Sequence, residues 1–445
     1  MGLRTYPSAT MNRRRYLAVA GGTALSTVVT GCTEALNGED AAAGSNGEAG
    51  GEEDLPEATS ALGADVTETV TMQNLELPWD IVFSGTGEVF FTERVGRIRR
   101  GPVEVLTEGG PADPDELPVE PVDLPGFVSS WEAGAQGIDL HPDYPDEPYV
   151  YVYYTVGEPG EAEDHTNRVI RYDATQEEPE VEILVDEIPG RHIHNGGRIA
   201  FGPEDRLWIL AGTGGTQELA RDPSSLGGAV LRITPDGEPA GADIDGGDPR
   251  TVTHGHRNPQ GIDWLPDGTP VVAEHGPAQR DELHLLQEGE DYGWNVARNG
   301  PADDDYESYL EHDFAKPIAS SGLDNTWAPS GGSVYDADAI PEWEGTFLLG
   351  GLISHRLHLF RFLEEEHRPP EDAAEIHDDE WLDERRLAVR HELYENEFGR
   401  IRHAAVGPDE SVYLLTSNTT GPIRPEVDDE FPRETDDVIV RIDPA

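Results

Sequence analysis

The stretch GIDWLPDGTPVVA at residues 261–273 holds a short apolar run, a Pro-Asp-Gly turn and a second apolar run. Two apolar runs joined by such a turn predict a pair of antiparallel strands. Units of the same form recur along the chain, at residues 79–91, 138–153, 198–210, 332–349 and 404–415. Six copies between residues 65 and 445 give a repeat of roughly 63 residues, which suits a β-propeller blade with long loops.

The repeats therefore predict an all-β chain, a six-bladed β-propeller of four-stranded antiparallel blades that occupies residues 66–445. A β-sandwich is the structural alternative, although six similar units would be unusual in one. Helical periodicity is almost absent, and only Trp381–Leu393 is expected to form a short helix. The strands Val66–Met72 and Val438–Ile442 are expected to pair and close the ring, which leaves no long strand edge exposed.

The charge balance of the chain is strongly acidic. It has 89 aspartates and glutamates against 31 lysines and arginines, a formal charge of −58, and Lys316 is the only lysine. A nucleic-acid binder needs a basic surface, so that class of protein is excluded. The acidic residues run through the whole chain and lysine is almost eliminated, which together predict a protein of a halophile. At molar salt the Debye length falls to about 3 Å, so the self-repulsion of such a surface is screened.

The first 32 residues read as a targeting segment. Residues 12–17 (NRRRYL) form a twin-arginine core, and the apolar stretch Leu17–Thr30 is shorter than the about 20 residues that span a bilayer. Val29–Cys32 resembles a lipobox and holds the only cysteine; a plain signal peptide with an incidental cysteine is the alternative. Residues 33–65, rich in Gly, Ala, Glu, Ser and Asp, are expected to be a flexible acidic linker. We therefore expect an exported protein, held at the extracellular face of the cytoplasmic membrane by a lipid on Cys32.

Two clusters of histidine, arginine and asparagine lie beside the repeated strands. Residues 192–198 (HIHNGGR) place His192 and His194 in a loop, where they could ligate a metal, act as a base or form surface hydrogen bonds. Residues 254–261 (HGHRNPQG) contain Arg257, a rigid fork for carboxylate or carbonyl oxygens, and Asn258, which both donates and accepts. A turn with an exposed arginine is the alternative reading of the second cluster.

Two further clusters suggest places for a cation and an anion. In residues 273–277 (AEHGP), the Gly276-Pro277 step can expose successive backbone carbonyls, and oxygen ligands of this kind suit calcium. In residues 399–403 (GRIRH), Arg400 and Arg402 are two apart, so in a strand they point the same way. Such a basic pair needs either the protein's own carboxylates or an anionic ligand beside it.

Taken together, these segments resemble the soluble aldose and glucose dehydrogenases that depend on pyrroloquinoline quinone (PQQ), from about Leu75 to the C-terminus. Leu77–Asp80 through Thr92–Arg94 is similar to the first blade of that family. Ala220–Gly228, followed by Leu231 and Arg232, is similar to its third-blade signature. Each motif is weak alone, but their number and order are specific to the family.

The resemblance implies an enzyme that oxidises an aldose sugar at C1 to the lactone. His194 matches the family's catalytic histidine, the base that removes the anomeric hydroxyl proton while hydride passes to the quinone. Arg257 and Asn258 match residues that contact the quinone oxygens and polarise the reacting carbonyl. The electrons would pass to an external acceptor, which the sequence does not identify.

The resemblance also implies how the two cofactors are held. Gly276 and Pro277 match the carbonyl ligands of a calcium ion that binds the quinone as a Lewis acid. Arg400 and Arg402 match arginines that hold cofactor carboxylates, and Glu132 falls where the family has a pocket-facing Gln or Glu.

One departure from the family leaves other functions open. The family's PQQ-contacting lysine is expected near Leu352–Arg356, but this stretch has no lysine, and His355 or Arg356 is the candidate replacement. A calcium-dependent lactonase-type propeller hydrolase is the first alternative, and it would need a carboxylate-rich metal centre in the channel. A non-catalytic propeller that serves as a binding module is the second.

Overall fold

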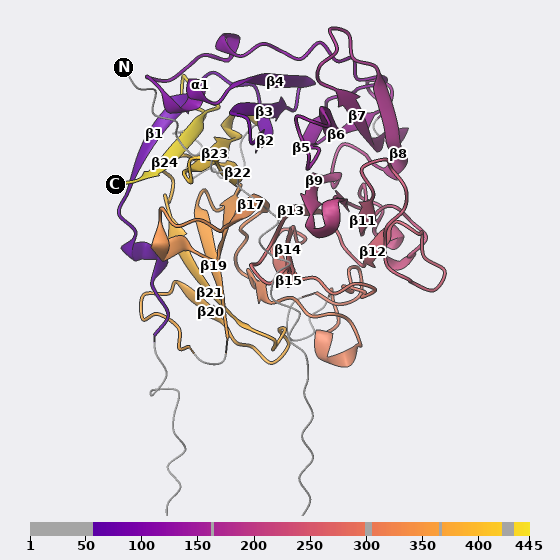
Figure 1. Cartoon of the computed structure of the whole chain (residues 1–445). Helices are drawn as coiled ribbons and strands as arrows, with labels where there is room; N and C mark the ends of the chain where they lie inside the picture. The colour runs from indigo at the N-terminus through magenta and orange to yellow at the C-terminus, as the bar shows by residue number, and fades with distance from the viewer. Residues whose placement is uncertain (1–56, 162–163, 299–304, 365–366, 421–430) are drawn as a thin grey trace, which may run out of the picture.

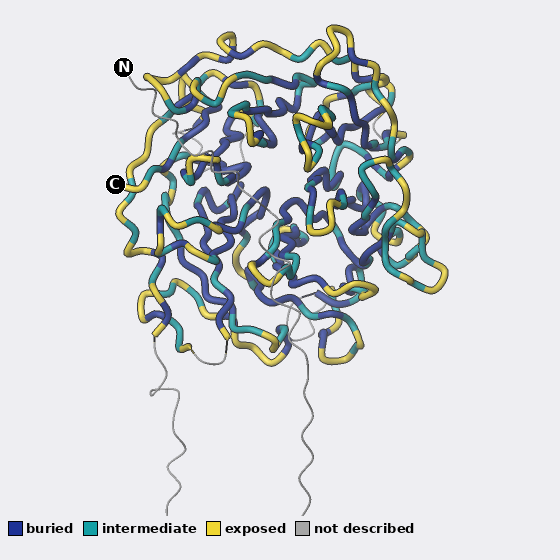
Figure 2. Tube along the Cα trace, in the orientation of Figure 1, coloured by how far each residue is buried: buried dark blue, intermediate teal, exposed yellow. Residues whose placement is uncertain are grey.

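The computed structural model describes residues 57–161, 164–298, 305–364, 367–420 and 431–445. Six antiparallel sheets stand around a central axis, so the predicted six-bladed propeller is confirmed (Figure 1). The innermost strands of neighbouring blades contact each other all the way round the ring, through β2, β5, β9, β13, β17 and β22. Figure 2 shows the buried chain near these inner strands and the exposed chain on the outer loops.

The first three blades follow the chain in order. Blade one is β2 (Pro78–Phe83), β3 (Glu88–Glu93) and β4 (Arg97–Pro102). Blade two is β5 (Ala135–Leu140), β6 (Tyr149–Val156), β7 (Thr166–Asp173) and β8 (Val181–Pro189). Blade three is β9 (Gly196–Gly202), β10 (Arg206–Ala211), β11 (Ala229–Ile233) and β12 (Thr251–His254).

The remaining blades include the one that closes the ring. Blade four is β13 (Pro259–Trp264), β14 (Pro270–Glu274), β15 (Glu282–Leu285) and β16 (Ala319–Ser320). Blade five is β17 (Pro329–Tyr335), β18 (Thr346–Gly351), β19 (Leu357–Leu363), β21 (Leu387–Leu393) and β20 (Glu375–His377). Blade six is β22 (Ile401–Val406), β23 (Val412–Thr416), β24 (Ile439–Pro444) and β1 (Val66–Met72).

Helix is scarce in the described residues. The one α-helix there, α1, is a single turn at Glu104–Thr107. Short 3-10 helices lie at Ala61–Gly63, Pro114–Glu116, Pro203–Asp205, Gln217–Arg221, Tyr309–Glu311, Pro341–Trp343 and Asn418–Thr420. The expected helix at Trp381–Leu393 is wrong: Leu387–Leu393 forms β21, whose residues pair one for one with β19 from Leu357↔Leu393 to Leu363↔Leu387. Tertiary pairing with an open strand edge outweighs the local helical pattern.

Two blades depart from the predicted four strands, because blade five has a fifth strand and blade one has only three. The outer edge of blade one is covered by residues 118–120, where the Arg100 N–H donates to the Pro118 carbonyl at 3.2 Å and the Glu120 N–H donates to Ile98 at 2.8 Å. Proline cannot donate to a strand ladder, and this segment begins with Pro118 and is followed by Pro121. It therefore covers the edge without becoming a full strand.

The ring closes as predicted, by pairing between the ends of the folded chain. β1 pairs with β24 from Val66↔Pro444 to Met72↔Ile439, so the N-terminal strand completes the last blade. Between neighbouring blades the sheets pack through apolar side chains, such as Tyr151 and Val169 of blade two against Leu231 of blade three. This arrangement leaves the inner loops at one end of the ring free to carry polar side chains.

The predicted linker begins outside the described residues, and its last part is packed. Ala61 is 2% exposed, and the Trp343 indole N–H donates to its carbonyl at 3.0 Å. Residues 57–65 therefore belong to the folded body. The targeting segment and Cys32 lie outside the described residues, and within the described ranges no helix is both long enough and apolar enough to cross a membrane.

Candidate active site

Five of the eight residues singled out in the sequence line one cavity of about 160 Å³ inside the ring. They come from loops of four different strand connections: before β5, between β8 and β9, between β12 and β13, and between β14 and β15. The lining consists of Glu132, His194, Arg257, Asn258, His275, Gly276, Ala278, Asp281, Thr326, Ala328 and Ile353. Pro277, Arg400 and Arg402 stand outside this lining.

His194 is held on three sides. Its backbone N–H donates to a carboxylate oxygen of Glu132 at 2.8 Å, and its carbonyl accepts the Gly214 N–H at 2.9 Å. An Arg257 guanidinium N–H donates to the His194 Nε2 at 2.9 Å. Because guanidinium only donates, Nε2 is the acceptor and the neutral ring carries its proton on Nδ1.

The electrostatics keep His194 neutral. Burial, and then the charge of Arg257, lower the pKa of His194 to about 3. Burial and the neighbouring Arg298 lower the pKa of Arg257 to about 10, so it remains a cation at neutral pH. The result is an unprotonated imidazole whose lone pair is already directed at a positive charge. Any proton it accepts must compete with that charge.

Asn258 and the glycines beside it fix the loops around the histidine. The Asn258 side-chain oxygen accepts the Gly196 N–H at 2.9 Å, which joins the β12–β13 loop to the histidine loop. Gly196 has φ +66°, and a Cβ there would lie 2.3 Å from the Leu210 carbonyl oxygen, so only glycine fits. The Thr213 N–H donates to the Arg257 carbonyl at 3.0 Å, which gives the arginine loop a second backbone anchor.

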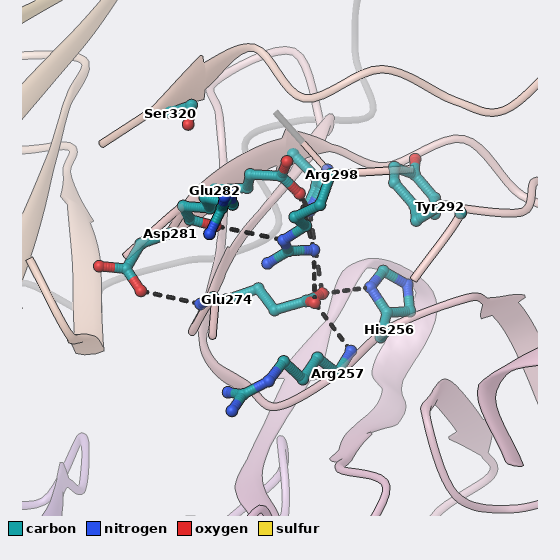
Figure 3. Close-up of polar contacts among 12 residues, drawn as sticks. His256, Arg257, Glu274, Asp281, Glu282, Tyr292, Arg298 and Ser320 are labelled. Atoms are coloured by element: carbon teal, nitrogen blue, oxygen red, sulfur yellow. Dashed lines mark hydrogen bonds and ion pairs between the residues drawn. The ribbon is translucent and has the colours of Figure 1, made fainter. Parts of the chain in front are cut away.

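The Glu274–Asp281 loop is anchored at both ends by a buried carboxylate (Figure 3). One Glu274 oxygen accepts the Arg257 backbone N–H at 2.7 Å, and the other accepts from His256 Nδ1 at 2.8 Å. Asp281 accepts the Gly276 N–H at 2.8 Å, and its second oxygen accepts from Thr326 Oγ1 and from two backbone N–H groups. Burial raises the pKa of Asp281. The two carboxylates therefore hold both Arg257 and the Gly276 carbonyl loop.

A buried arginine completes this network. Arg298 donates to Glu274 at 2.9 Å and lies 2.7 Å from Glu282, and all three side chains are fully buried. Burial alone would raise the pKa of Glu274, but Arg298 and His256 outweigh it and hold the pKa well below its usual range. Glu274 lies in the 273–277 segment singled out in the sequence and Asp281 follows it closely, but Arg298 gave no signal there, because its carboxylate partners lie elsewhere in the chain.

Within the described residues, one group of three His, Cys, Asp or Glu side chains has its ligand atoms close enough together to hold a metal ion. This group lies in the same region. Its members are His256, Glu274 and His284, within 4.8 Å of one another. Arg298 already neutralises Glu274 there. This group is therefore part of an ion-pair network, and the carboxylate-rich channel centre that the hydrolase alternative needs is absent from the described chain.

Arginines gather in the channel beside the cavity. Burial, and then Arg94 and Arg400, hold the pKa of Arg402 well below its usual range. Arg402 donates to the Gln260 side-chain oxygen and to Ser330 Oγ, both at 3.1 Å, and both partners are neutral. Its Nε and that of Arg94 are buried without a hydrogen-bond partner among the described residues. Mutually repelling, incompletely bonded guanidiniums suit an anion with several carboxylates.

The other predicted contacts have local partners. Arg400 donates through Nε to the Ser417 carbonyl at 3.0 Å and through a terminal nitrogen to the Leu352 carbonyl at 3.1 Å. The Pro277 carbonyl accepts the Gln279 N–H at 2.7 Å. Of the two candidates for the missing lysine, Arg356 pairs with Glu392 and Glu395, whereas His355 is 2% exposed and meets Phe431 edge to face.

Comparison with known proteins shows which family this chain belongs to. The model of the glucose/sorbosone dehydrogenase family matches residues 75–424. The chain is 28% identical over 291 residues to quinoprotein glucose dehydrogenase B of Acinetobacter calcoaceticus, which covers 57% of this chain and 58% of that protein. It is 25% identical over 388 residues to the aldose sugar dehydrogenase YliI of Escherichia coli, which covers 82% of this chain and 94% of that protein.

A solved structure shares the fold at comparable identity. The PQQ-bound form of aldose sugar dehydrogenase from Streptomyces coelicolor superposes with a TM-score of 0.63 and 29% identity, over 85% of this chain and 98% of that chain. The matched part of this chain includes every residue of the cavity lining.

Proposed function

Because this chain belongs to the glucose/sorbosone dehydrogenase family, we propose that it oxidises an aldose at C1 to the lactone, with PQQ as the hydride acceptor and calcium bound beside it. The observation that carries the proposal is the pairing of His194 Nε2 with Arg257 at 2.9 Å in a polar cavity next to incompletely neutralised arginines. A base, a polarising cation and an anion site are the three features that this reaction needs.

His194 acts as the base in this proposal. Its Nε2 is unprotonated and receives the proton of the anomeric hydroxyl, while Nδ1 keeps its own proton. For this transfer, the hydrogen bond that the Arg257 guanidinium donates to Nε2 must first break. A negative charge in the cavity draws the guanidinium away and raises the pKa of His194, so the base becomes effective when an anionic cofactor is present.

The arginine group would hold the carboxylates of PQQ. When bound, the quinone accepts the hydride, and the calcium withdraws charge from it. Arg402 offers its unpaired Nε, and Arg94 adds a second orphaned donor from blade one. Arg257 and Asn258 contribute donors within the cavity lining, and the Gly276-Pro277 loop, anchored by Asp281, would supply the backbone carbonyls for calcium.

The location of the protein is part of the same proposal. The twin-arginine core and the lipobox-like Val29–Cys32 support a propeller at the extracellular face of the cytoplasmic membrane, tethered through a lipid on Cys32 and passing electrons to an external acceptor. Cys32→Ser should move the protein from the membrane fraction to the soluble fraction. Equal membrane fractionation of variant and parent would place the tether elsewhere.

The experiment that tests the function is reconstitution in molar salt. Purified protein is titrated with PQQ and calcium, quinone absorbance is followed, and reduction of an artificial dye is then measured with a panel of aldoses. The proposal expects saturable PQQ binding and sugar-dependent dye reduction that disappears when PQQ is omitted. Binding without dye reduction by any aldose would favour the non-catalytic propeller instead.

A further inference from the structure

A solvent-exposed tryptophan lies at the edge of the cavity. Trp131 is 77% exposed, the highest value among the exposed large apolar side chains of the described chain, where the next is Leu310 at 51%. Its neighbours in the sequence, Ser129, Ser130 and Glu132, are polar. A large apolar side chain in this position contributes little to burial in the folded protein.

The backbone beneath Trp131 makes its presence more unusual. Ser130 and Ala133 exchange backbone hydrogen bonds of 3.2 and 2.8 Å, so Trp131 and Glu132 are the two central residues of a tight turn. Trp131 has φ +53°, and Glu132 is not left-handed. A left-handed first central residue marks the turn type in which glycine is favoured at that position, and a bulky residue there is strained. Stability therefore does not explain the tryptophan.

The turn is tied directly to the catalytic histidine loop. The Glu132 N–H donates to the His192 carbonyl at 3.0 Å, and the Glu132 carboxylate accepts the His194 N–H at 2.8 Å. The indole meets the His192 ring edge to face, with the ring centroids 6.1 Å apart. Glu132 and His194 line the cavity, whereas Trp131 does not. The indole thus lies next to the reaction site but outside the space for the reacting group.

We propose that Trp131 is a stacking platform for the second sugar ring of a reducing oligosaccharide. One face of a pyranose ring is covered by C–H groups, which pack on an aromatic face while the hydroxyls stay in water. The polar cavity would take the reducing-end ring, and the indole would take the ring attached to it. This inference rests on the proposed function, and it narrows the substrate class to oligosaccharides with a free reducing end.

Kinetics on matched sugars test the platform. Trp131→Gly, Trp131→Phe and the control Leu310→Ala are compared with the parent on glucose, maltose and cellobiose, with PQQ, calcium and salt fixed. In Trp131→Gly we expect kcat/KM to fall three- to tenfold for the disaccharides, the scale of an aromatic stacking contact, and less than twofold for glucose. Trp131→Phe should recover part of the loss and Leu310→Ala should have no effect. The melting temperature of Trp131→Gly should equal or exceed that of the parent.

A binding measurement separates this inference from the function it rests on. The indole N–H signal of Trp131, assigned by its loss in Trp131→Phe, should shift on addition of maltose or cellobiose to the parent and not on addition of equal glucose. That shift in a protein that oxidises no sugar would support the platform while refuting the enzyme. An equal kinetic loss for glucose and the disaccharides, or no loss for either, would overturn the platform even in an active enzyme.

Discussion

Replacing Arg257 by methionine should raise the pKa of His194. In the parent, burial and Arg257 lower that pKa to about 3, and an Arg257 N–H donates to Nε2 at 2.9 Å. Methionine keeps much of the side-chain volume but removes the charge and the donor. A hydrogen bond to a charged group is worth about 1.5–3 kcal/mol, and a pKa unit corresponds to about 1.4 kcal/mol. The pKa should therefore rise by about 1–2 units, and it should stay below the usual value because burial remains.

The measurement is a histidine nitrogen NMR titration at one fixed salt concentration, with the His194 signals assigned by their loss in His194→Asn. His377 provides an internal control, because burial and Arg390 lower its pKa to about 3 in blade five. Its pKa should not change in Arg257→Met. An unchanged His194 pKa would show that Arg257 does not control the base. A pKa near 6.5 would show that the variant has opened the site to water.

Four further predictions follow from the site and the surface. Arg402→Ala should weaken PQQ binding about ten- to a hundredfold, whereas His194→Ala should abolish turnover and leave the PQQ affinity nearly unchanged. Absorbance titration measures the affinity and dye reduction measures the turnover. If each variant changed affinity and turnover equally, the division of roles would be contradicted. Glu274→Gln leaves Arg298 with Glu282 as its carboxylate partner and should lower the free energy of unfolding by about 3 kcal/mol in a denaturant titration. A change within about 0.5 kcal/mol, the size expected for an ordinary surface substitution, would refute a stabilising role for the ion pair. Burial holds the pKa of His275, His284, His358 and His403 well below the usual range, so the unfolded chain binds more protons below pH 6.5 and stability should fall as pH drops from 7.5 to 5.5. Asp80 and Asp437, whose pKa burial raises to about 6, take up protons in the folded state and offset part of this loss; equal or greater stability at pH 5.5 would contradict the account. The melting temperature should rise from dilute buffer to molar salt, since the −58 charge repels itself when unscreened, and a flat response would refute the halophile interpretation.

The repeated strand–turn–strand units made the fold predictable. Each unit buries its own apolar residues in a short local hairpin, so the pattern is visible within about fifteen residues of sequence. The closing pair β1 and β24 was also predictable, because a ring without a sealing strand leaves an open edge. Leu387–Leu393 was not, since its strand state depends on the edge of β19, which its own sequence does not reveal.

The site residues also fall into two groups, those that could be predicted from the sequence and those that could not. His194, Arg257, Asn258 and Gly276 were found because their motifs lie beside repeated strands and together resemble those of the sugar dehydrogenase family, and the structure brings them into one cavity. Arg298 was missed because its two carboxylate partners come from β14 and β15, and a lone arginine in so acidic a chain carries no signal. The exposure and left-handed backbone of Trp131 are likewise properties of the folded turn.

Anaerobic mixing of the PQQ- and calcium-loaded protein with an aldose tests the central claim most directly. The quinone spectrum is followed in a stopped-flow instrument at fixed molar salt, and the sugar product is identified afterwards. We predict that the quinone is reduced in a single turnover, that the lactone is formed in equal amount, and that His194→Ala binds PQQ but leaves it oxidised. Quinone that stays oxidised with every aldose tested, in a parent protein that has bound PQQ, would contradict the assignment of this cavity as a sugar dehydrogenase site.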